Sequence, residues 1–131
     1  MAHLSFHCSR NLSKYLELNS FCDVMRKTMI QTKNFPIGGI RVRGFVADVI
    51  SLADGDPNHN FLDMILRMGE GRSTDVRKII AEAIYSSAED FIKKKNLKDP
   101  IALSLEIIEI NKEFSIKRYN TVHSAITKPP N

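Results

Sequence analysis

The chain has 131 residues, of which 43% are hydrophobic and 26% charged, and a formal net charge of +4 at pH 7. This length and composition predict one soluble globular domain, and no apolar run approaches the roughly 18 to 20 residues that cross a bilayer, so we expect a cytoplasmic protein without membrane contact. The modest positive charge favours acidic partners, but aromatic residues do not alternate with basic ones as they do in platforms for single-stranded nucleic acids, so nucleic-acid binding is not expected.

The N-terminal part of the chain predicts a strand followed by a helix. Residues 3–8 alternate between apolar and polar side chains, which is the pattern of a half-buried strand. Residues 12–18 suggest a short helical turn, and apolar side chains at helical spacing then predict a helix over 20–33. Ser20, with Asp23 three residues later, approximates a capping box, so we expect the helix to begin there.

The stretch from Phe35 to Arg43 ends this helix and starts a second strand. Its proline resists helix continuation, and its two adjacent glycines let the backbone turn. The pattern that follows predicts a strand over residues 40–50. Arg41 and Arg43 share one face of that strand, and two guanidinium groups on one face suggest an anion site. By themselves they equally suit the solvated side of an edge strand.

The second half repeats the order strand, helix, strand. Asp54-Gly55 is a turn signal and residues 61–68 alternate again, so we predict a hairpin between this strand and the second one. A helix follows, capped by Ser73 or Thr74 and ending in a run of three lysines, whose charges suit a helix C-terminus. Residues 101–110 then predict a mostly apolar, buried strand.

These elements predict an α+β fold of the order β-α-β-β-α-β, with a four-stranded sheet and two helices on one of its faces. We expect a single domain over residues 1–123 and a loose C-terminal tail over 124–131, with a short element near 119–126. Because the helices cover one face alone, the other face suits contacts with further copies of the chain.

Cysteine and histidine patterns give no sign of a metal or cofactor site. Cys8 and Cys22 belong to no close Cys/His cluster, so we expect two inert thiols and neither a zinc site nor a disulfide. His3 and His7 lie on one strand face, but at about 3.3 Å rise per residue they are too far apart to chelate one metal ion together. We therefore expect no metal and no cofactor.

Six short patterns, spread in order along the chain, together resemble one enzyme family. They are Ala2-His-Leu-Ser-Phe-His-Cys-Ser9, Phe35-Pro-Ile-Gly-Gly-Ile-Arg41, Ala53-Asp-Gly55, Gly69-Glu-Gly-Arg-Ser73, Ala102-Leu-Ser-Leu-Glu-Ile107 and Asn120-Thr-Val-His123. At this order and spacing they resemble the 5-carboxymethyl-2-hydroxymuconate delta-isomerase family of the tautomerase superfamily. The resemblance implies a cofactor-independent isomerase of aromatic compound catabolism, a homotrimer of tautomerase-like subunits, and a small dicarboxylate substrate.

The resemblance also implies roles for individual residues. Members of the family use an amino-terminal proline as general base once the initiator methionine is removed, while arginines hold the substrate carboxylates and polarise its carbonyl. Here position 2 is Ala2, in place of that proline. Arg41 and Arg72 match the family's substrate-binding arginines, and Arg43 and His3 are secondary candidates beside them.

The chemical state of Ala2 leaves alternatives open. If Met1 is removed, which the small second residue favours, the free α-amine has a usual pKa of about 7.7 to 8.0, and nearby arginines or burial can lower it into the range of a base. A free primary amine can also form a Schiff base with a keto acid. If Met1 stays, the nitrogen of Ala2 is a non-basic amide, and Met1 occupies the place of the substrate.

Three functions remain open from the sequence. The first is an isomerase that moves a proton within an unsaturated 2-hydroxy or 2-keto dicarboxylate such as 5-carboxymethyl-2-hydroxymuconate. The second is a catalytically impaired homologue that binds small carboxylates without turnover, because Ala2 replaces proline. The third is a nucleic-acid-binding module, which rests on the basic charge alone and ranks last.

Overall fold

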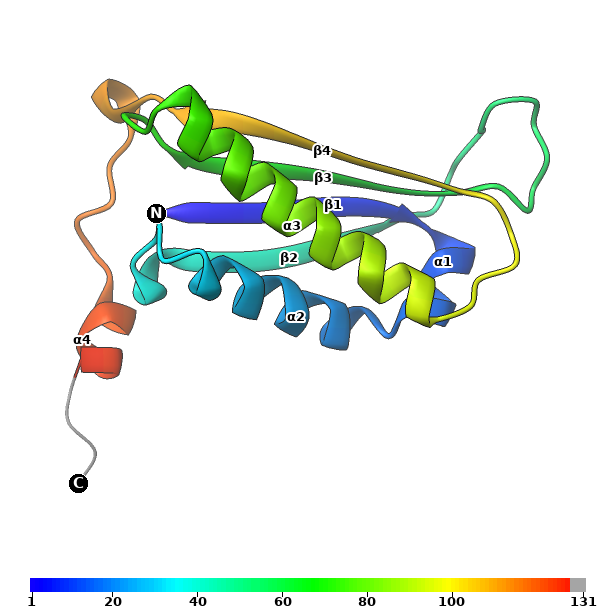
Figure 1. The fold of residues 1–131 in the computed structure, drawn as a ribbon, viewed down its shortest axis with the longest axis horizontal. Coiled ribbons are helices and arrows are strands. Elements are labelled where there is room, and N and C mark those ends of the chain that lie inside the picture. Colours follow the sequence, from blue (N-terminus) through cyan, green and yellow to red (C-terminus); the bar gives the residue numbers. More distant parts are fainter. Residues whose placement is uncertain (128–131) are drawn as a thin grey trace.

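A computed structural model describes residues 1–127 of the chain, and its centre is a four-stranded sheet (Figure 1). The strands are β1 (Ala2–Ser9), β2 (Ile40–Ala47), β3 (Asn60–Gly69) and β4 (Ile101–Ile110), in the spatial order β2-β1-β3-β4. β1 runs parallel to β2 and antiparallel to β3, and β3 runs parallel to β4. The predicted α+β fold class and the predicted order of strands and main helices are confirmed.

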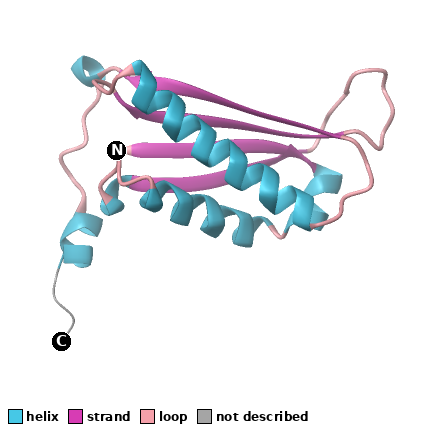
Figure 2. Ribbon diagram, in the orientation of Figure 1, coloured by secondary structure: helices cyan, strands magenta, loops and turns pink. Residues whose placement is uncertain are grey.

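Helices cover one face of this sheet (Figure 2). The long helices α2 (Leu18–Gln31) and α3 (Thr74–Lys94) lie across it, and the shorter α1 (Arg10–Leu16) follows β1 directly. The single-turn 3-10 helices η1 (Ile37–Gly39) and η2 (Lys112–Phe114) and the short α4 (Thr121–Thr127) lie toward the end of the sheet where β1 begins. None of the helices within residues 1–127 is long and apolar enough to cross a membrane.

The core lies between the sheet and the two long helices. Inward side chains of β1 and β3 are fully buried, namely Ala2, Leu4, Phe6, Cys8, Leu62, Met64, Leu66 and Met68. Phe6 meets Phe21 of α2 edge to face, with 5.1 Å between ring centroids, and burying a side chain of this size contributes about 1.5 to 3 kcal/mol. Gly44 of β2 makes room for that ring, because a Cβ at Gly44 would lie 2.1 Å from the Phe6 Cζ.

The predicted hairpin between the second and third strands is wrong. β1 lies between them and pairs with both, so that Ala2 is opposite Ile40 on one side and Met68 on the other. The connection over residues 48–59 is too long for a two-residue hairpin turn, and it carries the chain past the end of β1 to its other edge. The predicted turn does form, since Gly55 has a φ of +90°, but it bends this loop and joins no pair of strands.

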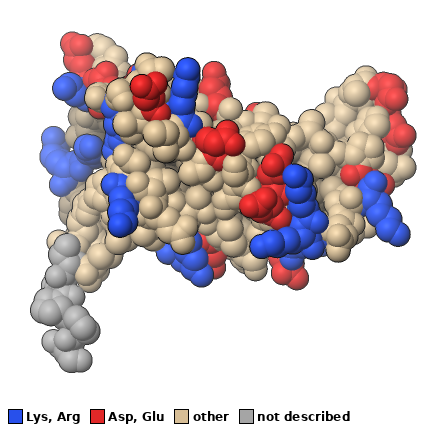
Figure 3. Space-filling model, in the orientation of Figure 1, with Lys and Arg blue, Asp and Glu red and all other residues tan. Residues whose placement is uncertain are grey.

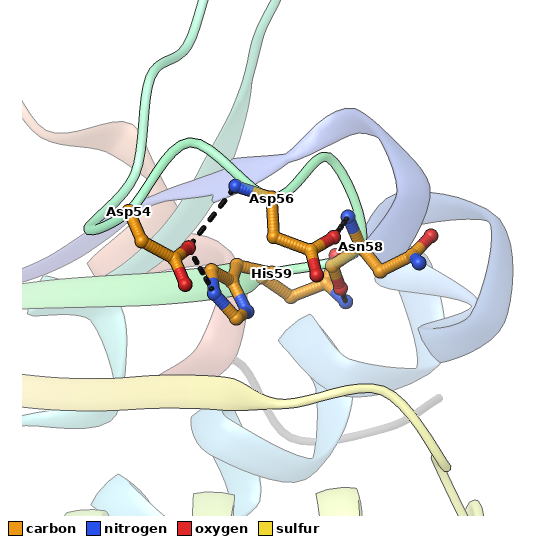
Figure 4. Close-up of polar contacts among 5 residues, drawn as sticks. Asp54, Asp56, Asn58 and His59 are labelled. Atoms are coloured by element: carbon orange, nitrogen blue, oxygen red, sulfur yellow. Dashed lines mark hydrogen bonds and ion pairs between the residues drawn. The ribbon is translucent and has the colours of Figure 1, made fainter.

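Polar groups in the 48–59 loop bond to one another (Figure 4). Asp54 Oδ1 accepts from the Asp56 backbone N–H at 3.1 Å and lies 2.8 Å from His59 Nε2. Asp56 Oδ1 in turn accepts from the Asn58 N–H at 2.9 Å. The Asp56 N–H, followed by His59, lowers the pKa of the Asp54 carboxyl below its usual 3.8. The loop therefore satisfies its own polar groups at the end of the sheet away from residue 1.

Of the two predicted helix starts, one is confirmed and one is wrong. Ser73 caps α3, its Oγ accepting from the Val76 N–H at 3.2 Å. Ser20 caps nothing, because α2 already begins at Leu18. Glu17, with a left-handed φ of 52°, ends α1 and starts α2 at the same residue, so the tight corner between the two helices overrides the local capping signal.

The C-terminal helix α4 docks on η1 through Gly38. A Cβ at Gly38 would lie 2.5 Å from His123 Nδ1, and Asn120 Nδ2 donates to the Gly38 carbonyl at 3.2 Å. Asn120 Oδ1 also accepts from two backbone N–H groups at the start of α4. The predicted short element near 119–126 is thus a helix. Residues 128–131, the end of the predicted tail, lie outside the described residues, and the domain boundary at residue 123 stays a prediction.

Candidate active site

Four segments meet where β1 begins and surround a hollow of about 380 Å³. They are the start of β1, the turn over residues 36–39, the start of β2 and the irregular stretch that leads to α4, all at one end of the molecule (Figure 1). Residues on its wall include Met1, His3, Arg41, Lys117, Asn120 and His123. This volume lies within the range of about 300 to 1,000 Å³ that is usual for small-molecule sites.

The turn over residues 36–39 packs against the first residue of the chain. The Gly39 N–H closes the turn by donating to the Pro36 carbonyl at 2.9 Å. A Cβ at Gly39 would lie 3.2 Å from the Met1 Cα, closer than side chains ordinarily pack. The glycine therefore lets the start of the chain approach the turn and the hollow beside it.

Arg41 and Lys117 bring two cationic groups to the wall. Arg41, half-buried on β2 opposite His3, donates from Nη1 to the Gly39 carbonyl at 3.1 Å. Lys117 comes from the stretch between η2 and α4. Lys and Arg side chains gather at this end of the molecule (Figure 3). Cations that converge on a concave surface form a site for carboxylates.

The α-amine of Met1 lies among these charges. Partial burial lowers its pKa from the usual 8.0, and repulsion by Lys117, Arg72 and Arg41 lowers that pKa further. A lower pKa keeps a larger share of the amine neutral near pH 7, and the neutral form is the one that accepts a proton. The arrangement therefore places a basic nitrogen beside carboxylate-binding groups.

His3 is a neutral hydrogen-bonding group on the same wall. Burial first, and then repulsion by Arg67, Arg43 and Arg41, lower its pKa from 6.5 to about 4. Its Nδ1 lies 3.2 Å from Arg43 Nη1. A guanidinium can only donate, so Nδ1 accepts and the ring proton is assigned to Nε2. That Nε2 is buried without a hydrogen-bond partner among residues 1–127.

Arg72 approaches the chain start from the β3 side. Its Nη1 donates to the Gly69 carbonyl at 3.2 Å, its Nη2 donates to the Asn34 carbonyl, and its guanidinium lies 5.0 Å from the Phe35 ring centroid. It is not among the residues that line the hollow, yet its charge lowers the pKa of the Met1 amine. Arg72 thus links the end of β3 to the segment after α2 through hydrogen bonds, and its effect on the site is to lower the pKa of the Met1 amine by charge repulsion.

The residues singled out in the sequence occupy different places around this site. Ala2, the fully buried first residue of β1, places its nitrogen next to Met1. His3 and Arg41 line the hollow, whereas Arg43 is exposed and reaches it through its contact with His3. Met1 itself lines the hollow, where a substrate would have to lie.

Sequence patterns did not indicate Lys117, Tyr119 and Asn120 as wall residues of this hollow. They belong to the stretch 111–120, which has no periodic pattern, and only the path of this stretch in space brings them next to Met1. One sequence signal for this wall does exist, because Asn120 opens the Asn120-Thr-Val-His123 pattern and Lys117 shortly precedes it.

A larger hollow of about 510 Å³ lies between α2 and α3. Its wall is of mixed character, since Thr28 and Ser87 bond to each other at 2.7 Å while Asp90 and Lys94 carry opposite charges. The hollow of about 380 Å³ beside Met1, with its converging cations, is the better anion site. Within residues 1–127, no group of three or more His, Cys, Asp or Glu side chains is placed to hold a metal ion.

The chain is similar to proteins of one family over nearly its whole length. A family model described as 5-carboxymethyl-2-hydroxymuconate isomerase matches residues 2–126. The 5-carboxymethyl-2-hydroxymuconate Delta-isomerase of Escherichia coli is 29% identical over 124 residues, which cover 95% of this chain and 98% of that relative.

Solved structures show the same likeness. A crystal structure of a 5-carboxymethyl-2-hydroxymuconate delta-isomerase is 25% identical with a TM-score of 0.89, covering 100% of this chain and 96% of its own. A 5-carboxymethyl-2-hydroxymuconate isomerase from Deinococcus radiodurans R1 is 26% identical with a TM-score of 0.87, covering 97% of this chain and 95% of that one. These matches confirm the family and the fold that the ordered sequence patterns predicted.

Proposed function

Because the chain belongs to the 5-carboxymethyl-2-hydroxymuconate isomerase family, we propose that it moves a proton within an unsaturated 2-hydroxy or 2-keto acid that carries two or more carboxylates, such as 5-carboxymethyl-2-hydroxymuconate. The observation that carries this proposal is the α-amine of the first residue beside a hollow lined by Arg41 and Lys117. Proton transfer within such an acid needs a base next to groups that hold carboxylates and stabilise negative charge.

The general base is the amine of Ala2, in the form of the chain from which Met1 has been removed. Ala2 directly follows Met1, whose amine has its pKa lowered by partial burial and by Lys117, Arg72 and Arg41, so the amine of Ala2 lies near the same cations, which disfavour its protonated form. The neutral amine takes a proton from the substrate, and the electron pair spreads over the conjugated system to the oxygen on C2. The ammonium then returns the proton to another position, so atoms and charge balance.

The surrounding side chains bind the acid and stabilise the intermediate charge. Arg41 and Lys117 hold carboxylates on the wall of the hollow. His3 lines the hollow as a neutral imidazole, and Arg43 fixes its tautomer by donating to Nδ1. Arg72 contributes through its charge, which favours the neutral form of the amine. A donor directed at a developing oxyanion is typically worth about 10²- to 10³-fold in rate.

Turnover by the Met-free protein tests this proposal. Protein whose first residue has been verified as Ala2 by mass spectrometry is mixed with 5-carboxymethyl-2-hydroxymuconate, and the dienol and enone absorbances are followed. The expected result is conversion well above the rate in buffer. No conversion above buffer by the verified Met-free form would overturn the isomerase function. Ala2→Pro serves as the positive control, because it restores a cyclic secondary amine as the base.

A second candidate function is a carboxylate-binding protein without turnover. The position of Met1 favours it, because Met1 lines the hollow, and a retained Met1 leaves Ala2 with a non-basic amide nitrogen. Mass spectrometry of protein from its native host separates the two functions. Retained Met1 together with carboxylate binding and no turnover supports the binding protein, whereas quantitative removal of Met1 supports the isomerase.

We also propose a homotrimer in the cytoplasm. The face of the sheet away from α2 and α3 carries exposed apolar side chains such as Phe45, paired with His7, and Ile108, paired with Arg67, which suit burial against further copies of the chain. Cys8 and Cys22 are both free, which is usual in a reducing compartment. Light scattering coupled to size exclusion measures the mass of the assembly, and a monomer would contradict the trimer.

A further inference from the structure

A second, smaller hollow adjoins the first at Met1. It has a volume of about 90 Å³ and is lined by Met1, Gly69, Ile110, Lys112, Ser115 and Lys117. Met1 and Lys117 line both hollows, so these two residues separate one from the other. The start of the chain therefore lies on the boundary between two concave surfaces that both bear lysine.

We propose that the smaller hollow is the subsite for a second carboxylate-bearing arm of the substrate, and that removal of Met1 joins it to the larger hollow. The inference rests on the proposed function. In the joined space the Ala2 amine faces the conjugated part of the acid. Arg41 holds a carboxylate on one side of the amine, and Lys112 and Lys117 hold the carboxylate of the arm on the other.

The lining fits a short anionic arm in charge and in size. Its lining residues include two lysines, Lys112 and Lys117, and one serine, Ser115, which suit a carboxylate, while Ile110 suits a methylene group. The neighbouring carboxylate of Glu70 accepts from the Lys112 backbone N–H at 3.3 Å, and no salt bridge between Glu70 and the Lys112 ammonium group forms among residues 1–127. The volume corresponds to about three water molecules at roughly 30 Å³ each, which is the scale of a carboxymethyl group.

Met1 closes this subsite while it is present. It packs against the turn at Gly39, with its Cα 3.2 Å from the position of a Cβ there, and it fills the boundary between the hollows. Its removal frees the volume of a whole residue and leaves Ala2 first, whose small side chain is buried in the core. Removal of Met1 therefore has two effects at once: it exposes the Ala2 amine, and it makes room for the carboxylate-bearing arm of the substrate.

The subsite predicts selectivity for acids with a third carboxylate. The carboxymethyl arm of 5-carboxymethyl-2-hydroxymuconate is absent from 2-hydroxymuconate. Removing an ammonium partner from a bound carboxylate typically lowers affinity about tenfold or more. The ratio of kcat/KM for the two substrates isolates the contact to the arm, because effects on the chemical step that both substrates share cancel in the ratio.

Kinetics of lysine variants in the Met-free protein test the subsite. Lys112 is the best position, since it lines the smaller hollow and not the larger one, and Lys98→Met in the exposed loop after α3 is the matched control for charge. The measured quantity is kcat/KM for 5-carboxymethyl-2-hydroxymuconate divided by kcat/KM for 2-hydroxymuconate. This ratio should fall about tenfold in Lys112→Met and further in the Lys112→Met/Lys117→Met double variant, and it should keep the wild-type value in Lys98→Met. An unchanged ratio in the single and double variants overturns the subsite.

Calorimetric binding tests the subsite without turnover. Two forms of the wild-type chain, one starting at Met1 and one at Ala2, are released from cleavable fusions and titrated with tricarballylate and with glutarate. The form starting at Ala2 should prefer the tricarboxylate about tenfold, and the form starting at Met1 should show no preference. Equal preference in both forms overturns the subsite. A preference confined to the Ala2 form, without isomerase turnover, sustains the subsite and overturns the proposed function.

Discussion

The two ends of the sheet use their polar side chains differently. At the end where β1 begins, Arg41 and Lys117 lie on the wall of one hollow, and His3 Nε2 has no hydrogen-bond partner among residues 1–127. At the opposite end, in the 48–59 loop, the histidine and carboxylate bond to each other, with Asp54 Oδ1 2.8 Å from His59 Nε2 (Figure 4). Basic side chains gather at the first end, and acidic ones are prominent at the tip of the loop (Figure 3).

This difference shows how a structural polar cluster is told from a functional one. Groups that bond to one another within a loop stabilise the loop and have little capacity left for a ligand. Around the hollow, by contrast, Arg41 and Lys117 come from separate elements and form no salt bridge with a carboxylate among residues 1–127, so their charges stay available for a ligand. The variants below affect one end or the other, and each tests whether the two ends are as independent as the contacts indicate.

Loss of Arg41 should have the largest effect. In Arg41→Met the main guanidinium on the wall is gone, so we expect kcat/KM of the Met-free protein to fall by about 10²-fold or more. The matched variant is Arg10→Met, which breaks the ion pair with Asp48 at the other end of the sheet. Steady-state kinetics should show no change for Arg10→Met, and similar losses in both variants would contradict the assignment.

Two glycine substitutions should separate activity from stability. In Gly38→Ala the new methyl group meets the His123 ring, so α4 shifts and we expect kcat/KM to fall several-fold with about 1 to 3 kcal/mol lost from the free energy of unfolding. In Gly55→Ala, where φ is +90° and the space is open, we expect about 1 to 3 kcal/mol of strain and unchanged kcat/KM. Urea unfolding and kinetics measure both; reduced activity in Gly55→Ala would refute the independence of the two ends.

The pH dependence of the rate should respond to Lys117. Its charge lowers the pKa of the Met1 amine, and we expect the same repulsion to act on the Ala2 amine of the Met-free protein, so Lys117→Met should raise the pKa of the base. Because the neutral amine is the active form, the rise of kcat/KM with pH moves to higher pH. Profiles from about pH 6 to pH 10 measure the shift, with Lys98→Met as control. A shift to lower pH would show that another group is the base.

The smallest effect is expected from Asp54→Asn. The folded-state pKa of Asp54 is below its usual 3.8, so its carboxylate adds stability that is present above that usual value and lost as pH falls through the folded pKa. The variant should therefore melt slightly below wild type at neutral pH, with the difference vanishing in acid and kcat/KM unchanged. Thermal melts across the acid range measure this, and a difference that persists at the lowest pH would point to a cause other than charge.

Much of the architecture was readable from local patterns. The period-two alternation of residues 3–8 and 61–68 indicated which side chains face the core, and Ser73 marked the start of α3. Arg41 stood out because it shares one strand face with Arg43 and ends the Phe35-Pro-Ile-Gly-Gly-Ile-Arg41 pattern. These features depend on neighbours within a few residues, and such neighbours are visible in the sequence.

The pairing of the strands and the second cation of the site depended on the whole fold. A turn signal at Asp54-Gly55 suggested a hairpin, but β1 takes the place between β2 and β3 because its two edges can bond both strands and its Phe6 packs over Gly44. Lys117 reaches Met1 only because the chain after β4 returns across the end of the sheet and α4 packs on Gly38. Contacts between residues this far apart in the chain arise from packing, so sequence patterns identified one wall of the hollow and the tertiary structure supplied the other.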